Sequence, residues 1–184
     1  VHVQGPMSAF LTPDILAAFL TLAALQGCGV KAGLLTTIEC RVGDRVIPNP
    51  TRLTTQEAPV VQALLAEMVE AGCTHAVIEA TSHGLELHRL DDCEFDVAVF
   101  TNLSEDHLDL HGTIERYFAA KASLFTAERS ERGLSNCDDP YGRLLADGAA
   151  IVMNCFGASD LSDVVADLGP PREGFVGDRG LRCL

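Results

Sequence analysis

The chain has 184 residues, 47% of them hydrophobic, and carries 26 acidic against 13 basic side chains, for a formal net charge of -13. With a mean hydropathy of +0.19, this composition fits an α/β protein long enough to bury one substantial core. The negative charge argues against nucleic acid or an anionic membrane surface as the main partner, and the most apolar stretch, 15–25, is too short to span a bilayer.

The order of expected elements alternates strands with helices. A strand ends at a glycine near position 5, and Thr12 with Pro13 forms a favourable helix start. The expected elements are a strand over 1–5, a helix over 12–26, a strand over 30–37, a hairpin over 41–47, a helix over 55–72, a strand over 76–80, a strand over 97–101, a helix over 114–125 and a strand over 149–153. This alternation predicts one mostly parallel sheet flanked by helices.

Beyond position 125 the pattern weakens. The segment 136–142 has the composition of a loop, and the last thirty or so residues, rich in Gly, Asp and Pro, suggest hairpins. Seven cysteines form no CxxC pair and several lie in apolar runs, so they are interpreted as reduced core thiols in a cytoplasmic protein.

The richest segment for chemistry is the run 106–112, Asp-His-Leu-Asp-Leu-His-Gly. It places four ionisable side chains in six positions after the apolar run 95–100, which is typical of a buried parallel strand. Ligands of open α/β sheets bind beyond the carboxyl ends of the strands. These side chains are therefore expected to point into a crevice.

Several segments together resemble the central domain of the Mur ligases, most closely that of the UDP-N-acetylmuramyl tripeptide synthetases. They fall in the family's order and spacing over roughly residues 1 to 145 and are 33–39, 53–59, 65–72, 79–85, 95–112, 117–125 and 136–142. The resemblance implies a P-loop-NTPase-like fold. It also implies that the chain is a C-terminally incomplete central domain, without the uridine-binding N-terminal domain and the amino-acid-selecting C-terminal domain.

The implied activity is that of an ATP-dependent ligase in peptidoglycan precursor synthesis. Such a ligase phosphorylates a carboxylate of the UDP-muramyl dipeptide and lets the amino group of diaminopimelate or lysine displace the phosphate. Glu79 and His107 match family positions that hold Mg²⁺. Lys121 matches a lysine that is carbamylated by CO₂, although an exposed helix lysine is the plainer reading of its sequence context.

The resemblance also implies substrate and nucleotide contacts. Thr54, Thr55, Thr81 and Arg89 match positions that contact the UDP-muramyl peptide, and hydroxyl and guanidinium groups suit phosphate and carboxylate oxygens. For Thr55 a helix N-cap is an equal alternative. Asn136 and Asp139 match a segment near the nucleotide, and a turn explains them equally well. Leu53 and Leu87 stand where the family commonly has amides.

The phosphate loop departs from the family pattern. If Gly5 aligns with the first glycine of the loop, Ser8 replaces the second, Ala9 replaces the phosphate-binding lysine, and Phe10 replaces the hydroxyl that ligates magnesium. A phosphate loop binds phosphates through backbone N–H groups and a lysine charge, so these changes should strongly weaken the binding and use of ATP.

Two hypotheses about the function of the chain therefore stay open. The first is a monomeric tripeptide-synthetase-type ligase that uses ATP and Mg²⁺. The second is a catalytically inactive homologue that binds or scaffolds. A sister activity, such as folylpolyglutamate or cyanophycin synthesis, is disfavoured by the segments around Thr54 and Thr81. The 184 residues alone are expected not to complete the ligation.

Overall fold

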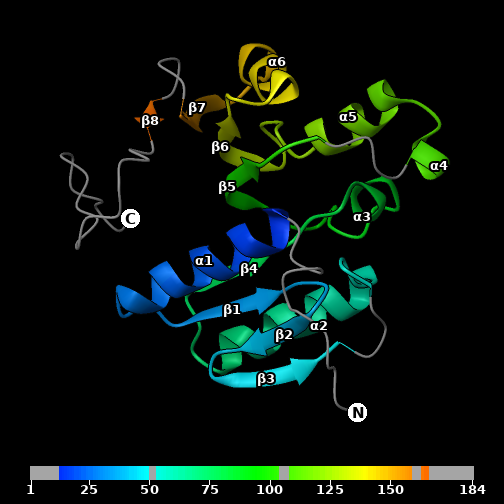
Figure 1. Cartoon of the computed structure of the whole chain (residues 1–184). Coiled ribbons are helices and arrows are strands. Elements are labelled where there is room, and N and C mark those ends of the chain that lie inside the picture. Colours follow the sequence, from blue (N-terminus) through cyan, green and yellow to red (C-terminus); the bar gives the residue numbers. More distant parts are fainter. Residues whose placement is uncertain (1–12, 50–52, 104–107, 159–162, 166–184) are drawn as a thin grey trace, which may run out of the picture. The chain divides into compact units, whose positions relative to one another are not determined.

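The computed structural model describes residues 13–49, 53–103, 108–158 and 163–165 (Figure 1). The chain divides into two compact units, Val1–Asp92 and Cys93–Leu184. Each unit contains a four-stranded sheet, with strand orders β3-β2-β1-β4 and β5-β6-β7-β8. The α/β class is confirmed, but the described strands form two sheets where the sequence predicted one. The expected strand over 1–5, the phosphate loop and His107 lie outside the described residues.

The first unit combines a parallel strand pair with an antiparallel hairpin. Its elements are α1 (Pro13–Gly27), β1 (Ala32–Leu35), β2 (Glu39–Val42), β3 (Arg45–Pro48), α2 (Ala58–Glu70), β4 (His75–Ile78) and α3 (Ser82–Glu86). β1 pairs parallel with β4, so Leu35 lies opposite Ile78. The predicted hairpin is confirmed as β2 and β3, whose two-residue turn contains Gly43 at a φ of 59°. That positive φ is one that glycine adopts without strain.

The end of α1 follows from a glycine cap. Gly29 adopts a φ of 77°, and the N–H of Val30 donates to the carbonyl of Leu25 at 3.0 Å. This six-residue closure gives the Leu25 carbonyl a second donor beside the N–H of Cys28, at 3.1 Å, and ends the helix. The chain then enters β1, whose Leu34 is fully buried beside Leu22 of α1.

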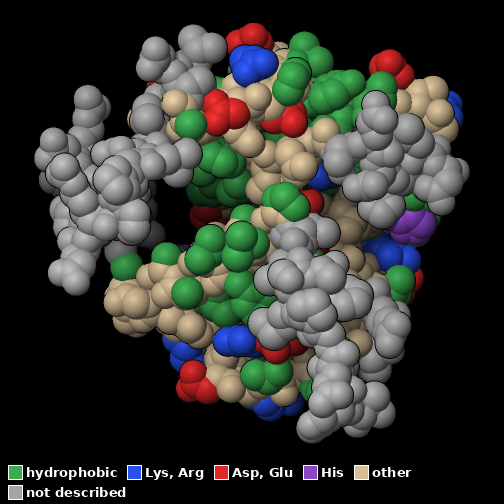
Figure 2. All heavy atoms as spheres, in the orientation of Figure 1, with side chains coloured by type: hydrophobic (Ala, Val, Ile, Leu, Met, Phe, Trp, Pro, Cys, Tyr) green, Lys and Arg blue, Asp and Glu red, His purple; other side chains and the backbone are tan. Residues whose placement is uncertain are grey.

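The second unit contains a fully parallel sheet. Its elements are β5 (Phe95–Phe100), α4 (Leu108–His111), α5 (Ile114–Ala122), β6 (Ser130–Asn136), α6 (Pro140–Gly148), β7 (Val152–Gly157) and β8 (Val164–Val165). Each neighbouring pair of strands is parallel. Phe100 packs edge-on against Phe118 and Phe125. The expectation that β5 is buried throughout is wrong, because the side chains of Val97 and Val99 are 52% and 46% exposed. Hydrophobic side chains also lie between charged ones on the face drawn in Figure 2.

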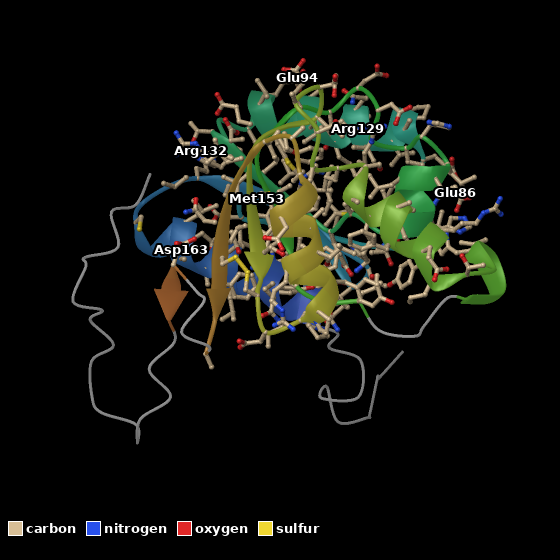
Figure 3. All side chains as sticks on the ribbon, turned by 90° about the horizontal axis from the view of Figure 1, so that it is seen from above. Glu86, Glu94, Arg129, Arg132, Met153 and Asp163 are labelled. Carbon is tan, nitrogen blue, oxygen red and sulfur yellow. A yellow bond between two sulfur atoms is a disulfide. The ribbon has the colours of Figure 1, made fainter. Side chains whose placement is uncertain are left out.

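Each sheet contains a glycine that a methionine covers. An ideal Cβ on Gly33 of β1 would lie 2.3 Å from the sulfur of Met68, and one on Gly133 of β6 would lie 2.1 Å from the sulfur of Met153. Met153, labelled in Figure 3, comes from the neighbouring strand β7. Any side chain at either glycine would therefore collide with a thioether that fills the core at that point.

The expectation of reduced thiols throughout the chain is also wrong. Cys137 and Cys155 form a disulfide with a Cα–Cα distance of 5.5 Å. Cys137 directly follows β6, and Cys155 lies on the adjacent strand β7, so sheet pairing brings together two cysteines that are 18 positions apart in the sequence. Among the described cysteines, Cys40, Cys73 and Cys93 are free thiols.

Candidate functional site

Glu79 lies directly beyond the carboxyl end of β4, beside the end of β1. Its backbone N–H donates to the carbonyl of Leu35 at 2.9 Å, which continues the pairing of the two strands by one step. Its buried carboxylate oxygen Oε2 accepts hydrogen bonds from the backbone N–H and the hydroxyl of Thr37, at 3.0 and 3.2 Å. The carboxylate is thus held in place by the loop that follows β1, as expected for a ligand-binding position in a parallel sheet.

Thr37 links Glu79 to the predicted substrate residue Thr54. The two hydroxyl oxygens lie 2.6 Å apart, and because Thr37 donates its proton to Glu79, Thr54 is the donor to Thr37. The sequence did not single out Thr37. Its only signal was its place in the segment 33–39 that resembles the family.

Thr55 and Thr81 form a second, directional chain of hydrogen bonds. Thr55 is 2% exposed, and its hydroxyl donates to the carbonyl of Glu79 at 3.1 Å. Its oxygen accepts from the backbone N–H of Thr81 at 3.0 Å and lies 3.0 Å from the hydroxyl of Thr81. The Thr81 oxygen in turn accepts from the N–H of Gly84 and caps α3. The capping alternative for Thr55 is wrong, since the N-cap residue of α2 is Glu57.

Arg89 contacts two residues of the same segment, Thr55 and Glu57. Its guanidinium is buried, at 8% exposure, and donates to the carbonyl of Thr55 at 2.9 Å and to the carboxylate of Glu57 at 2.6 Å. The planar fork of an arginine holds two acceptors in fixed positions, here the backbone carbonyl of Thr55 and the side-chain carboxylate of Glu57. Its third donor group, Nε, is buried and has no hydrogen-bond partner among the described residues.

Leu53 and Leu87, the two positions where the family commonly has amides, lie in different surroundings. The carbonyl of Leu53 accepts from the side-chain amides of Asn49 and Gln56, at 2.7 and 2.9 Å, so amide groups lie at this position although residue 53 is apolar. The Gln56 amide also donates to the Asn49 oxygen at 2.8 Å. Leu87, by contrast, is exposed directly after α3.

Lys121 lies in the second unit among aromatic rings. Its ammonium donates to the carbonyl of Asn102 at 3.3 Å and lies 5.7 Å and 5.6 Å from the ring centroids of Phe100 and Tyr117. Tyr117 is itself stacked on the buried ring of His111, with centroids 5.1 Å apart. Cation–π contacts of this kind stabilise the charged amine.

Asn136 and Asp139 shape the turn that follows β6. The Asn136 amide donates to the carbonyl of Thr101 at 2.9 Å. The Asp139 carboxylate caps α6 by accepting from the N–H groups of Tyr141 and Gly142, at 2.8 and 3.0 Å, and its other oxygen lies 3.5 Å from the N–H of Leu103. Both side chains therefore have the structural roles that the turn alternative predicts, and the same contacts place them beside the loop that follows β5.

The structure thus gathers the predicted residues into two groups. Glu79, Thr54, Thr55, Thr81 and Arg89 form one continuous network in the first unit, and the second unit contains Lys121, Asn136 and Asp139. Within the described part of the chain, no three His, Cys, Asp or Glu residues cluster closely enough to hold a metal ion. A metal site shared by Glu79 and His107 stays a prediction. No helix of the described ranges combines the length and hydropathy needed to cross a membrane.

Comparison with known proteins gives consistent matches. The family model of the Mur ligase middle domain matches residues 12–162. The UDP-N-acetylmuramyl-tripeptide synthetase of Roseiflexus sp. (strain RS-1) is 45% identical over 146 residues, which cover 72% of this chain and 29% of the relative. The UDP-N-acetylmuramoyl-L-alanyl-D-glutamate--2,6-diaminopimelate ligase of Streptomyces avermitilis is 46% identical over 133 residues, which cover 72% of this chain and 26% of the relative.

A solved structure agrees with these matches. The structure of a UDP-N-acetylmuramoyl-L-alanyl-D-glutamate--2,6-diaminopimelate ligase superposes with a TM-score of 0.68 at 31% identity. The superposition covers 79% of this chain and 30% of that one. The chain therefore spans less than a third of the length of these relatives.

Proposed function

Because this chain belongs to the Mur ligase family and matches its middle domain, we propose that it forms the central part of a ligase of peptidoglycan precursor synthesis. The proposed reaction adds diaminopimelate or lysine to UDP-N-acetylmuramoyl-L-alanyl-D-glutamate. The observation that carries the proposal is the network around Glu79. It joins residues that the family resemblance assigns separately to magnesium and to the muramyl peptide.

The proposed chemistry proceeds in two steps. The γ-phosphoryl group of ATP passes to the substrate carboxylate, which gives an acyl phosphate and releases ADP. The incoming amine then attacks the acyl carbon, loses a proton and displaces inorganic phosphate. Most of the catalysis of phosphoryl transfer is positioning and charge stabilisation, and bound Mg²⁺ would neutralise charge on the phosphate oxygens. Glu79 fits such an ion, since it offers a hard carboxylate oxygen held by Thr37. His107 is the second ligand that the resemblance implies.

The remaining site residues have proposed roles in binding. Thr54 and Thr81 offer hydroxyl groups, while the buried Thr55 hydroxyl and the Arg89 guanidinium hold the backbone that positions them. Together they would hold the oxygens of the muramyl peptide. Lys121 is the carbamylation candidate, and Gly5, Ser8, Asn136 and Asp139 belong to the proposed nucleotide side. A cytoplasmic monomer is part of the same proposal, because ATP and UDP-linked precursors are cytoplasmic substrates.

A catalytically inactive homologue is the second candidate, favoured by the composition of residues 5–12. Ala9 and Phe10 stand where the family has a lysine and a hydroxyl, if Gly5 begins the loop. The family match itself begins at residue 12, so residues 5–11 of this loop lie outside it. Loss of a single charge-assisted hydrogen bond lowers affinity by about ten- to a hundredfold.

A pair of grafts into the Roseiflexus relative tests both candidates. In the first graft, residues 12–162 replace the matching part of the relative, which keeps its own phosphate loop. In the second graft, residues 1–162 replace the corresponding part, so the loop of this chain comes with them. ATP-dependent amide formation with UDP-muramyl dipeptide and either amino acid is the readout.

The ligase proposal predicts that the first graft is active and that Glu79→Gln abolishes its activity. An inactive but folded first graft would overturn it. Activity of both grafts would remove the second candidate, whereas loss of activity only in the second graft would locate the defect in residues 1–11. Calorimetric titration of the 184-residue chain with MgATP gives an independent check, since micromolar binding would show that other groups rescue the loop.

A further inference from the structure

We propose that the Cys137–Cys155 disulfide is a redox-sensitive clamp on the turn that follows β6. The pair joins the end of one central strand to its neighbour within the second unit, at a Cα–Cα distance of 5.5 Å. Disulfides span Cα–Cα distances of about 4.4 to 6.8 Å, so the bond needs no movement of the backbone. The inference concerns this unit alone and does not depend on the proposed ligase activity.

The backbone around the pair is already aligned for the bond. Ser135 lies opposite Cys155 in the parallel register, and residues two apart on a strand point to the same face, so Cys137 and Cys155 share one face of the sheet. The N–H of Cys137 donates to the carbonyl of Phe156 at 2.8 Å. Because this backbone contact does not involve sulfur, the two thiols stay close together when the disulfide is reduced.

The two cysteine residues differ in burial. Cys137 is 2% exposed, whereas Cys155 is only partly buried. The N–H of Cys155 donates to the carboxylate of Asp163 at 2.9 Å, and Asp163 is labelled at the edge of the sheet in Figure 3. A reagent in solution would therefore reach the Cys155 side of the bond before the Cys137 side.

The exchange reaction balances with a glutathione-type thiol as the named reductant. Its thiolate attacks the Cys155 sulfur, the protein disulfide breaks, and Cys137 leaves as a thiolate that takes up a proton. A second thiolate then attacks the glutathione sulfur of the mixed disulfide and releases Cys155, which is also protonated. The protein gains two electrons and two protons, and the reductant becomes a disulfide. The reverse sequence oxidises the pair.

The turn that the bond holds contacts the loop after β5. Asn136 donates to the carbonyl of Thr101, and Asp139 accepts from the N–H of Leu103. Between those two residues lies Asn102, whose carbonyl accepts from Lys121. The turn is also tight, because an ideal Cβ on Gly142 would lie 1.9 Å from the carbonyl oxygen of Asn136. Reduction would therefore loosen a turn connected by two contacts to the surroundings of Lys121.

The test uses the 184-residue chain in buffers of fixed ratio of reduced to oxidised glutathione. Peptide mapping after rapid alkylation measures the fraction of Cys137 linked to Cys155, and amide hydrogen exchange follows residues 136–142 and, for comparison, the β2–β3 hairpin. We expect the linked fraction to rise and fall with the ratio. We expect exchange in 136–142 to rise at least about tenfold on reduction, with no change in the hairpin.

Matched variants separate this bond from other cysteines. Cys155→Ser should exchange at the reduced rate in every buffer, while Cys73→Ser, which removes a free thiol, should respond like the parent chain. Absence of the linked peptide at every ratio would overturn the proposal. So would a linked peptide whose reduction leaves exchange in 136–142 unchanged. Both measurements on the parent chain remain decisive if a variant fails to fold.

Discussion

Replacing Thr55 with valine tests whether the buried hydroxyl network holds the site together. Valine keeps the shape of threonine but removes the hydroxyl that donates to the carbonyl of Glu79 and accepts from the N–H of Thr81. Both backbone groups then lose a partner in a buried setting. Each unsatisfied buried donor or acceptor costs about 1 to 3 kcal/mol, so with two such groups we expect Thr55→Val to lower the free energy of unfolding by about 2 to 6 kcal/mol.

Thr55→Ser is the matched control. It keeps both hydrogen bonds and removes only the Cγ2 methyl, which lies 2.7 Å from the ideal Cβ position on Gly84 and so packs on that glycine. Loss of one buried methyl group costs about 0.5 to 1.5 kcal/mol. The two variants therefore separate the hydrogen-bond contribution from the packing contribution at a single position.

Urea denaturation followed by far-ultraviolet circular dichroism measures the stability, and amide hydrogen exchange localises the change. Thr81 caps α3 and takes its orientation from Thr55, so Thr55→Val should speed exchange in Ser82–Glu86 more than in α1. Thr55→Ser should leave α3 nearly unchanged. If valine costs no more than serine, the network contributes no stability and the reasoning about the site fails.

Three further outcomes follow from individual contacts. Gly142→Ala should destabilise the second unit by more than about 2 kcal/mol, as measured by thermal unfolding, because the new Cβ meets the backbone oxygen of Asn136. Burial raises the pKa of the Cys40 thiol, so maleimide should label it slowly in the folded chain and rapidly in urea; equal rates would contradict this. Hydrogen bonds from its own backbone N–H and from Thr113 lower the pKa of Glu115, so its small contribution to stability is present above the ordinary pKa and is lost as the pH falls through the lowered one. Titration by nuclear magnetic resonance should show Thr113→Val raising the pKa of Glu115 toward its ordinary value.

Much of the first unit is predictable because its sequence signals are local. Thr12 and Pro13 predict the start of α1, Gly29 predicts its end, and a Gly-Asp pair predicts the β2–β3 hairpin. The start of α2 was predicted three residues early, because Thr55 looks like an N-cap in sequence while its hydroxyl is engaged by Glu79 and Thr81. Hydrogen bonds between residues far apart in the sequence cannot be predicted from its hydrophobic periodicity.

The second unit shows why composition can hide a central strand. β6 contains polar residues at most of its positions and was not predicted, although it lies between β5 and β7. Its buried hydroxyls are satisfied by backbone carbonyls: Ser130 donates to Leu124 at 2.7 Å and Ser135 to Gly142 at 2.8 Å. The helix α6 that follows did carry a signal, since Asp139 and Pro140 form a capped helix start that is easily taken for a loop.

The candidate site was predictable in part. The residues Thr54, Thr55, Thr81 and Arg89 came from resemblance, and the structure joins them to Glu79. The connecting residue Thr37 and the amides of Asn49 and Gln56 were missed. Their roles depend on which loops meet beyond β1 and β4, which pairing of the strands decides.

The two glycine–methionine contacts make the cores sensitive to chemical damage. Oxidation of a methionine to its sulfoxide adds a polar oxygen to the very atom that lies against Gly33 or Gly133. No spare volume exists on the glycine side to receive that oxygen, so the modified side chain has to leave its place. Met153 is the more accessible of the two and Met68 is almost fully buried, so peroxide should damage the parallel sheet of the second unit first.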